Sequence, residues 1–169
     1  MLIEKIRKQT INIGPDGTSC KLSKPTSNDA ILSVENEFGF KLPELLKEIY
    51  SQIGNGGFGP GYGVMGIPGG FTDDQGEDIL SLYKSYRKSD PEDDTWAWPK
   101  GLVPICHWGC VVYSCVHCLE NEIPIYFADI GVKDPGEPME SILIKHKSSF
   151  EEWIRAWVDG VDLWAEVYK

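Results

Sequence analysis

The sequence predicts an α+β fold, in which helices pack against a mostly antiparallel or mixed β-sheet. Three observations support this prediction. The first half of the chain repeats the apolar spacing of amphipathic helices, short β-rich runs follow between residues 102 and 144, and another amphipathic helix comes last. With 169 residues, of which 41% are hydrophobic, the chain can bury one core. We therefore expect a single domain over residues 1–169.

The clearest element is a helix that begins at Pro43 and ends before Gly54. Pro43 suits the first helical position, where its missing N–H costs nothing. The apolar residues follow the i, i+3, i+4, i+7 pattern of one buried face: Leu42, Leu45, Leu46, Ile49, Tyr50 and Ile53. The next three residues tolerate positive φ, so we expect a sharp chain reversal at Asn55, Gly56 and Gly57.

Two elements are expected before this helix. Residues 2–24 are irregular or strand-like, and the apolar residues that alternate on both sides of a turn at residues 14–17 favour a short β-hairpin. Residues 27–29 are good helix caps, and helical spacing continues from them to a stop at Gly39. The short link to Pro43 predicts that these two helices pack as a helical hairpin.

The second half of the chain predicts most of the sheet. A short strand at 64–67 and a helix over 79–86, capped by residues 72–74, come first. Three β-rich runs then predict an antiparallel meander, and one more strand follows: residues 102–105, 111–116, 123–128 and 142–144. Ser149 and Glu152 form a capping box for the closing helix, which bends or breaks at Gly160.

The formal net charge of -10 makes nucleic acid a poor partner, because phosphate binding needs clustered Lys and Arg. A basic protein suits this charge, although acidity also serves solubility alone. The acidic residues form two clusters that bracket the helix at 79–86 and could share one face: Asp73, Asp74, Glu77 and Asp78, then Asp90, Glu92, Asp93 and Asp94. For the first cluster, interaction with the helix dipole is an alternative role.

The sequence also favours a cytoplasmic protein without a membrane partner. Its start carries charges where a signal peptide would be apolar, and no run of 18 apolar residues occurs. Five cysteines are an odd number, and four of them lie between Cys106 and Cys118, so reduced thiols are expected. The pattern predicts neither the oligomeric state nor whether exposed members of the set Trp96, Trp98 and Trp164 form an interface.

Three kinds of chemical site have partial matches in this sequence. Residues 61–66 match the glycine spacing of a dinucleotide-binding loop, but here a helix precedes the glycines and a strand follows, which is the reverse of the required order. A zinc site could draw on four cysteines and two histidines, yet strand alternation points these side chains to opposite faces: Cys106, His107, Cys110, Cys115, His117 and Cys118.

The third site, a Cys/His nucleophile, is disfavoured for the same reason, because thiol and imidazole must lie within hydrogen-bond reach. Buried cysteines also act as small hydrophobic residues. No pair of carboxylates stands out as an acid and base. We therefore expect no catalytic residues, no bound metal and no cofactor.

Four motifs together resemble the SUKH superfamily, over about residues 31–157. They are Leu42-Pro43 before an amphipathic helix, Asn55-Gly56-Gly57 after it, the run Pro104-Ile105-Cys106-His107-Trp108-Gly109-Cys110, and Ser149-Phe150-Glu151-Glu152-Trp153. That superfamily joins fungal cell-wall assembly regulators to bacterial immunity proteins, and the stretch from Trp108 to Cys118 is similar to a bacterial branch. The resemblance implies a non-enzymatic α+β domain whose motif residues determine the fold: Leu42, Pro43, Asn55, Gly56, Gly57, Trp108 and Gly109.

The resemblance also implies a function, since many bacterial members neutralise polymorphic toxins, often nucleases, by direct binding. The leading hypothesis is a cytoplasmic immunity protein whose two acidic clusters bind a basic toxin domain. The alternative is an intracellular adaptor or regulatory domain with no toxin partner. A zinc-binding module is the less favoured third reading.

Overall fold

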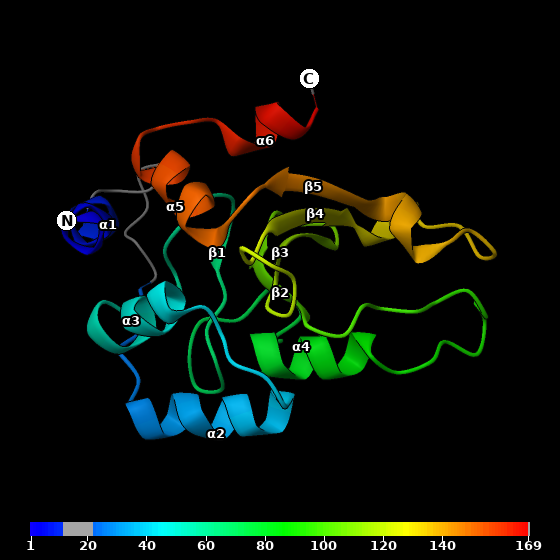
Figure 1. Cartoon of the computed structure of the whole chain (residues 1–169), viewed down its shortest axis with the longest axis horizontal. Helices are drawn as coiled ribbons and strands as arrows, with labels where there is room; N and C mark the ends of the chain where they lie inside the picture. The colour runs from blue at the N-terminus through cyan, green and yellow to red at the C-terminus, as the bar shows by residue number, and fades with distance from the viewer. Residues whose placement is uncertain (12–21, 169) are drawn as a thin grey trace.

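An antiparallel sheet with its strands in sequence order lies at the centre of the molecule (Figure 1). The computed structural model describes residues 1–11 and 22–168, and in these the sheet has five strands: β1 Gly63–Val64, β2 Leu102–His107, β3 Val112–His117, β4 Ile125–Asp129 and β5 Leu143–Lys147. Each strand pairs with the next in antiparallel register. The predicted α+β class and the predicted meander are therefore confirmed.

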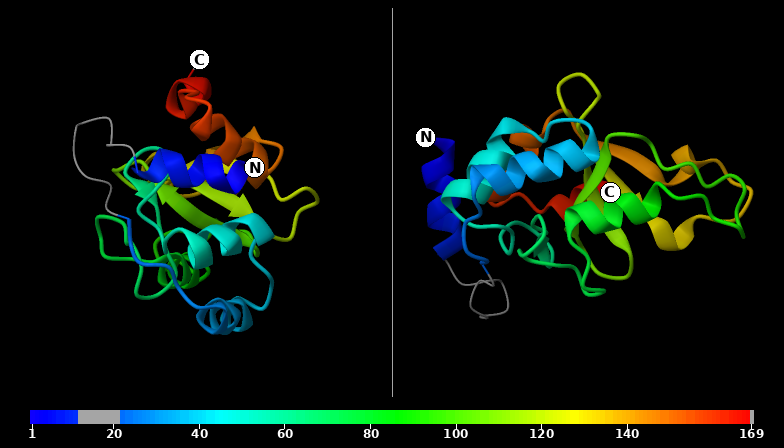
Figure 2. Two further views of the ribbon diagram at one scale, coloured as in Figure 1. Left: turned by 90° about the vertical axis from the view of Figure 1, so that its left-hand side faces the viewer. Right: turned by 90° about the horizontal axis from the view of Figure 1, so that it is seen from below.

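Helices cover both faces of this sheet. The α-helices of the described residues are α1 Leu2–Ile11, α2 Asn28–Phe38, α3 Glu44–Gln52, α4 Ile79–Tyr86, α5 Phe150–Val158 and α6 Leu163–Val167. In Figure 1, α4 lies below the strands and packs on β2, whereas α5 and α6 lie above them. Figure 2 shows α1 at one end of the molecule, where it packs against α5. None of these helices has the length and apolar character needed to cross a bilayer.

The helix signals read from the sequence mark real helix ends. The Ser27 side chain accepts a hydrogen bond from the N–H of Ala30 at the start of α2, and Gly39 ends this helix with φ of 80°. Pro43 lies one position before the first residue of α3 rather than inside the helix. The closing helix breaks near Gly160, as expected, and continues as α6.

The predicted amino-terminal hairpin is wrong over the residues that the structure describes. Residues 2–11 form α1, because Ile3, Ile6 and Thr10 share one helical face that is at most 6% exposed. Glu4 and Lys5 lie on its exposed side, so the charges that interrupt a strand pattern fit an amphipathic helix. The expected turn at 14–17 and the strand after it to residue 21 lie outside the described residues.

Two predicted boundaries between α3 and the sheet also need correction. The strand expected at 64–67 is limited to β1. The cap of α4 is Asp78 rather than residues 72–74: its carboxylate accepts hydrogen bonds from the N–H groups of Leu80 (2.9 Å) and Ser81 (3.0 Å), and the Ser81 hydroxyl accepts one from the N–H of Asp78. Residues 72–74 instead begin a turn.

The chain reversal after α3 is organised by Asn55, which is 4% exposed. Its side chain binds the backbone of Ile67, and its own carbonyl accepts a hydrogen bond from the N–H of Phe71 (2.9 Å). Gly66 passes so close that a Cβ atom there would lie 2.2 Å from the carbonyl oxygen of Asn55. This packing requires a glycine, and it fixes the loop that leads into β1.

The other motif residues lie at contacts between elements. Leu42 is buried and donates its N–H to the carboxylate of Glu35 in α2 (2.9 Å). The indole N–H of Trp108 donates to the hydroxyl of Ser114 in β3 (3.0 Å), and Gly109, with φ of 86°, turns the chain between β2 and β3. These contacts join α2 to the segment before α3 and connect β2 to β3.

Candidate functional site

The first acidic cluster is partly used to build the loop before α4. Asp73 is only 6% exposed; its Oδ1 accepts hydrogen bonds from the N–H groups of Gln75 and Glu77, and its Oδ2 accepts one from the hydroxyl of Tyr113 (2.9 Å). Asp78 is occupied as the α4 cap. Of this predicted cluster, Asp74 is exposed and Glu77 half-buried.

The two acidic clusters lie at the two ends of α4. The exposed charged side chains of its last turn and of the residues just after it are basic: Lys84, Arg87 and Lys88. Lys84 forms an ion pair with Glu37 of α2. Basic side chains therefore lie between the two clusters, and most of the exposed carboxylates of these clusters lie in residues 90–94.

The second cluster contains one buried carboxylate, Asp93, which is 8% exposed. The ammonium group of Lys133 lies 2.5 Å from its Oδ2, and the N–H of Gly136 donates to its Oδ1 (3.2 Å). The Thr95 hydroxyl adds a hydrogen bond to the carbonyl of Glu137 (2.8 Å). Asp93 thus holds together two loops that are about 40 residues apart in sequence.

These two loops, residues 88–97 and 131–138, extend side by side from the right-hand end of the molecule in Figure 1. We call this end the acidic projection and define it by its exposed carboxylates: Asp90, Glu92, Asp94, Asp134 and Glu137. Lys133 lies among them, but its side chain is 2% exposed and is paired with Asp93. The acidic projection therefore presents negative charge to solvent.

Aromatic residues fix the base of the acidic projection. Trp98 is buried, and Tyr86 of α4 packs against both tryptophans, with ring centroids 5.6 Å from Trp96 and 4.9 Å from Trp98. The indole N–H of Trp96 donates to the carbonyl of Tyr86 (2.8 Å), and the Arg87 guanidinium binds the carbonyl of Trp98. Trp96 and Trp98 thus position the loop rather than form an exposed interface.

The pKa of Asp93 is held well below its usual range, first by the hydrogen bond from Lys133 and then by that from Thr95. Asp93 therefore stays ionised at neutral pH beside the ammonium group of Lys133. Their charges cancel locally, so the field of the acidic projection comes from its exposed carboxylates.

Sequence reasoning missed Asp134 and Glu137 as members of this surface. Both lie in a Pro- and Gly-containing loop before β5, and nothing in a single sequence connects that loop to residues 90–94. The only local hint is Lys133, a lone basic residue that could have been matched with an acidic cluster. The contact between residues 90–94 and 131–138 depends on the sheet, because residues 131–138 connect β4 to β5 and lie near the end of α4.

Three of the four cysteines that the structure describes lie in positions that suit packing. Cys106 and Cys115 are buried in the core, and burial raises the pKa of both thiols; Cys118 is half-buried, and burial raises its pKa to about 12. Cys110 is exposed. Within residues 1–11 and 22–168, no three His, Cys, Asp or Glu side chains are grouped as metal ligands.

The glycine-rich segment at 61–66 uses backbone N–H groups in hydrogen bonds to β2 and to the loop before β1. Tyr62 and Met65 donate to the carbonyls of His107 (3.0 Å) and Ile105 (2.7 Å) in β2, and Val64 donates to that of Phe58 (2.5 Å) in the loop. A phosphate-binding loop needs free N–H groups that converge on the anion. The segment is therefore part of the β1 pairing, in agreement with the order of elements read from the sequence.

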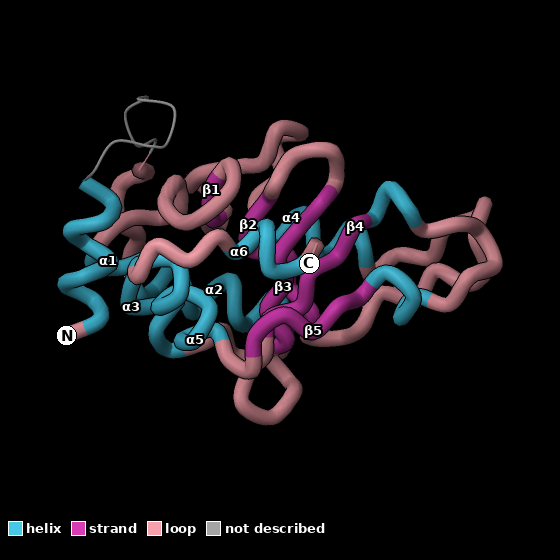
Figure 3. The backbone as a smooth tube through the Cα atoms, turned by 90° about the horizontal axis from the view of Figure 1, so that it is seen from above, coloured by secondary structure: helices cyan, strands magenta, loops and turns pink. Residues whose placement is uncertain are grey.

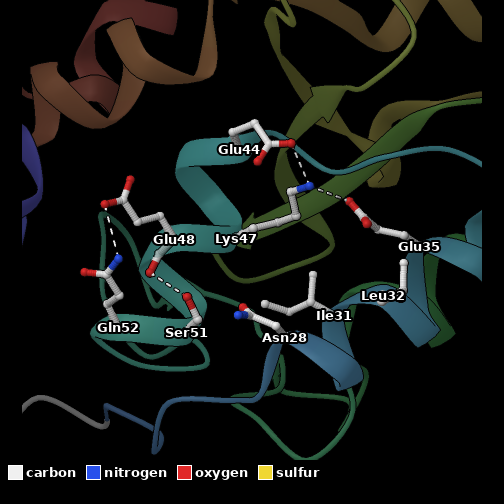
Figure 4. Close-up of a pocket in the computed structure, with 9 residues that line it drawn as sticks. All are labelled: Asn28, Ile31, Leu32, Glu35, Glu44, Lys47, Glu48, Ser51 and Gln52. Carbon is white, nitrogen blue, oxygen red and sulfur yellow. Dashed lines mark hydrogen bonds and ion pairs between the residues drawn. The ribbon is translucent and has the colours of Figure 1, made fainter.

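A groove of about 440 Å³ lies between α2 and α3 (Figure 4). Its charged groups pair with one another: Lys47 lies 3.0 Å from the carboxylate of Glu35 and 2.7 Å from that of Glu44. Burial lowers the pKa of Lys47, but its hydrogen bonds to Glu44 and Glu35 raise it overall. The lysine therefore stays charged, which suits a structural link between the helices and not a proton donor or acceptor.

The comparisons with known proteins place the chain in one family. A search of curated proteins found no match. A sequence model of the SMI1 / KNR4 family (SUKH-1) matches residues 25–156, which is most of the chain and runs from just before α2 into α5. The chain therefore belongs to the SMI1 / KNR4 family (SUKH-1).

Proposed function

We propose that this protein is a non-enzymatic binding protein of the immunity type, which acts in the cytoplasm and neutralises a cognate toxin by direct contact. The observation that carries this proposal is the acidic projection, whose five carboxylates are exposed while Lys133 is buried in an ion pair. Family membership supports the class of function, since the resemblance to SUKH proteins implies binding without catalysis.

The charge of the molecule suits a basic toxin domain, such as a nuclease. A nuclease must attract phosphate, so its substrate-binding surface carries Lys and Arg. A rigid acidic surface attracts such a protein over a distance of several ångströms and increases the rate of encounter. Bound there, it would cover the toxin's substrate-binding surface, and this requires no chemistry from the immunity protein.

The rigidity of the acidic projection also supports a binding role. Asp93 joins its two loops through Lys133 and Gly136, and the packing of Trp98 against Tyr86 holds their base. A surface that is already ordered loses little conformational entropy when a partner binds. Exposed carboxylates on such a surface can keep a fixed pattern of charge.

The test is capture of the partner from the native host, followed by a protection assay. The tagged full-length chain is expected to retain a protein with a basic toxin domain, and co-expression of the chain should restore growth of cells that express that domain. Capture of a non-toxic regulatory protein, with no protection, would instead favour the adaptor role. Catalytic turnover of the partner by this chain would contradict both binding functions.

A further inference from the structure

A second surface of the molecule gathers aromatic side chains around α6. Trp164 of α6 packs against Trp108, Phe127 and Tyr168, with ring centroids 5.4, 5.7 and 4.8 Å away. We call Trp108, Trp164 and Tyr168, together with Phe127 beneath them, the aromatic surface. Figure 3 shows α6 lying over the strands, and α4 covers the opposite face of the sheet in Figure 1.

The aromatic surface is exposed although its members are large. Tyr168 is 56% exposed, Trp164 is 39% exposed and Trp108 is half-buried, while Phe127, at 2%, forms the floor. Exposed Trp and Tyr side chains that touch one another are enriched at the centres of binding interfaces. If α6 served only to cover the sheet, we would expect the Trp164 and Tyr168 rings to be more completely buried.

Several contacts hold the aromatic surface in one conformation. The indole N–H of Trp108 is fixed by its hydrogen bond to Ser114. The carboxylate of Glu166 in α6 lies 3.0 Å from the imidazole of His146 and 2.9 Å from the ammonium of Lys147, both in β5. Trp164 on α6 and Tyr168 directly after it are thus presented by a segment that is itself attached to the sheet.

Acidic residues outnumber basic ones around the aromatic surface. Residues 159–168 contain Asp159, Asp162 and Glu166 but no Lys or Arg, while Lys147 of β5 is paired with Glu166 and Lys169 lies outside the described residues. Within the described part of the chain, only Glu166 of these three forms a salt bridge. Burial and then the charge of Asp129 raise the pKa of Tyr168, which places a further carboxylate near this ring.

Part of this surface lies outside the family match. The match ends at residue 156, and α6 begins at Leu163. Trp164 and Tyr168 therefore lie beyond the matched residues, whereas Trp108 and Phe127 lie within them. A segment that exposes aromatic rings next to carboxylates has a composition suited to recognition.

We propose that the aromatic surface binds arginine side chains of a basic protein segment. The flat guanidinium group stacks on Trp and Tyr rings through cation–π contact. The carboxylates of Asp129 and Asp162 each cap a backbone N–H group with one oxygen, and their other oxygens accept hydrogen bonds from the guanidinium. A second copy of this chain is disfavoured as the occupant, because each copy carries a net charge of -10. The inference goes beyond the proposed function, since it holds whether or not the basic partner is a toxin.

The test follows the tryptophan indole N–H resonances of the full-length ¹⁵N-labelled protein by NMR. The probe is an alternating glycine–arginine octapeptide with blocked ends, titrated at physiological ionic strength, where charges beyond about 8 Å are screened. A glycine–citrulline peptide keeps the shape without the charge, and a glycine–lysine peptide keeps the charge without the planar group. Trp164→Leu is the test variant, and Tyr62→Leu, which removes an exposed ring outside the aromatic surface, is its matched control.

The arginine peptide is expected to shift the resonances of Trp108 and Trp164 and to bind Trp164→Leu about tenfold more weakly than Tyr62→Leu. The lysine peptide should bind more weakly and the citrulline peptide should cause no shift. Unchanged resonances of Trp98 and Trp153, which are buried, would show that the variant retains its fold.

Four results would overturn the inference. They are no shift of Trp164, equal shifts with the citrulline peptide, shifts that depend on protein concentration alone, and shifts confined to Trp96. The second would show an apolar binding surface and the third a contact between copies of the chain. The fourth would place the arginine peptide on the acidic projection, because Trp96 lies at its base.

Discussion

The side chain of Asn55 binds both polar groups of the Ile67 backbone. Its Oδ1 accepts a hydrogen bond from the N–H of Ile67 (2.9 Å), and its Nδ2 donates one to the carbonyl of the same residue (3.2 Å). Both residues are buried. The amide of Asn55 thus makes the hydrogen bonds that a neighbouring strand would make to the buried backbone of Ile67, which lies outside the strands of the sheet.

Replacement of Asn55 by Ala should therefore destabilise the fold by about 2 to 4 kcal/mol, since it leaves a buried N–H and a buried carbonyl without partners. Urea unfolding of the purified protein measures this change. Asn36→Ala, at an exposed position in α2, is the matched control and should change stability little. Equal stability of the two variants would show that the Asn55 bonds contribute no net free energy.

A methyl group at Gly66 should be as damaging as the loss of Asn55. The Cβ atom of Gly66→Ala would lie 2.2 Å from the carbonyl oxygen of Asn55 and 2.5 Å from its Oδ1, and the backbone atom has little room to move. We expect a loss of about 3 kcal/mol or more. Gly131→Ala is the matched control, because the atom nearest to a Cβ at Gly131 is 3.4 Å away. This variant should unfold at nearly the same urea concentration as the unmodified protein.

The sequence predicts the elements whose pattern is local and regular. The helices at 28–38, 44–52 and 150–158 have periodic burial and clear end signals. The strands of the meander are short β-rich runs bounded by turn residues, although β2 is buried throughout, so these elements could also be read without partners. The strand prediction for residues 2–11 is wrong because it assigns this segment the two-residue period of a strand. Ile3 and Ile6 are three positions apart, which is the spacing of one helical face, and the charged residues between them lie on the exposed side of α1.

The candidate site was less accessible to sequence reasoning because it depends on tertiary contacts. Asp73 and Asp93 look like their acidic neighbours in the sequence, yet Tyr113 and Lys133, which are 40 residues further along, make them buried hydrogen-bond acceptors. The same contacts bring residues 131–138 to the surface formed by residues 90–94. Such pairings leave no mark in the local pattern of charge.

The arrangement of thiols predicts very different reactivities. Cys20 lies outside the described residues, so a Cys20→Ser protein isolates the other four thiols. Cys110 should react with a colourless disulfide reagent at least 100-fold faster than Cys106 and Cys115. A factor of roughly this size is expected because burial keeps the Cys106 and Cys115 thiols protonated and hidden from the reagent. Cys110→Ser should remove the fast phase.

Rapid labelling of Cys106 or Cys115 in the folded protein would contradict the buried positions of these side chains. The same preparation tests the zinc-binding reading, because thiolates bound to zinc would release the metal on modification. We expect elemental analysis to find much less than one zinc per chain. One zinc per chain would restore the zinc module as a candidate function.

Removal of the exposed charges of the acidic projection should slow association with the captured partner. In Asp90→Asn/Glu92→Gln/Asp94→Asn, Asp93 is kept, so the link to Lys133 remains. At low salt we expect an association rate constant about tenfold lower, with a weaker dependence on salt. Stopped-flow fluorescence measures both quantities.

The matched control removes the same number of charges from exposed positions on three helices: Asp29→Asn/Glu44→Gln/Glu151→Gln. It should associate nearly as fast as the unmodified protein, because these residues lie on α2, α3 and α5 rather than on the acidic projection. Equal slowing of both triple variants would assign the effect to net charge. No slowing in either variant would remove electrostatic steering from the proposed function.

Two buried histidines should make stability depend on pH below neutrality. In His107 and His146 the Nδ1 atom is buried and, within the described part of the chain, has no hydrogen-bond partner. Burial lowers the pKa of both side chains below 6.5, although Asp73 and Asp74 near His107 and Glu166 beside His146 oppose this effect. Each histidine therefore stays neutral in the folded protein at pH values where it is protonated in the unfolded chain.

The sign of the pH effect follows from this difference. From about pH 7 downwards, the unfolded chain takes up protons that the folded protein does not, so the free energy of unfolding should fall, by at most about 1.4 kcal/mol per pH unit for each histidine. Urea unfolding at pH 7.0, 6.0 and 5.5 measures the slope, and His107→Gln/His146→Gln should flatten it. His117 is present in both proteins, so its contribution cancels. The same slope in both proteins would show that neither imidazole resists protonation in the fold, and that the orphaned Nδ1 atoms find partners when they gain a proton.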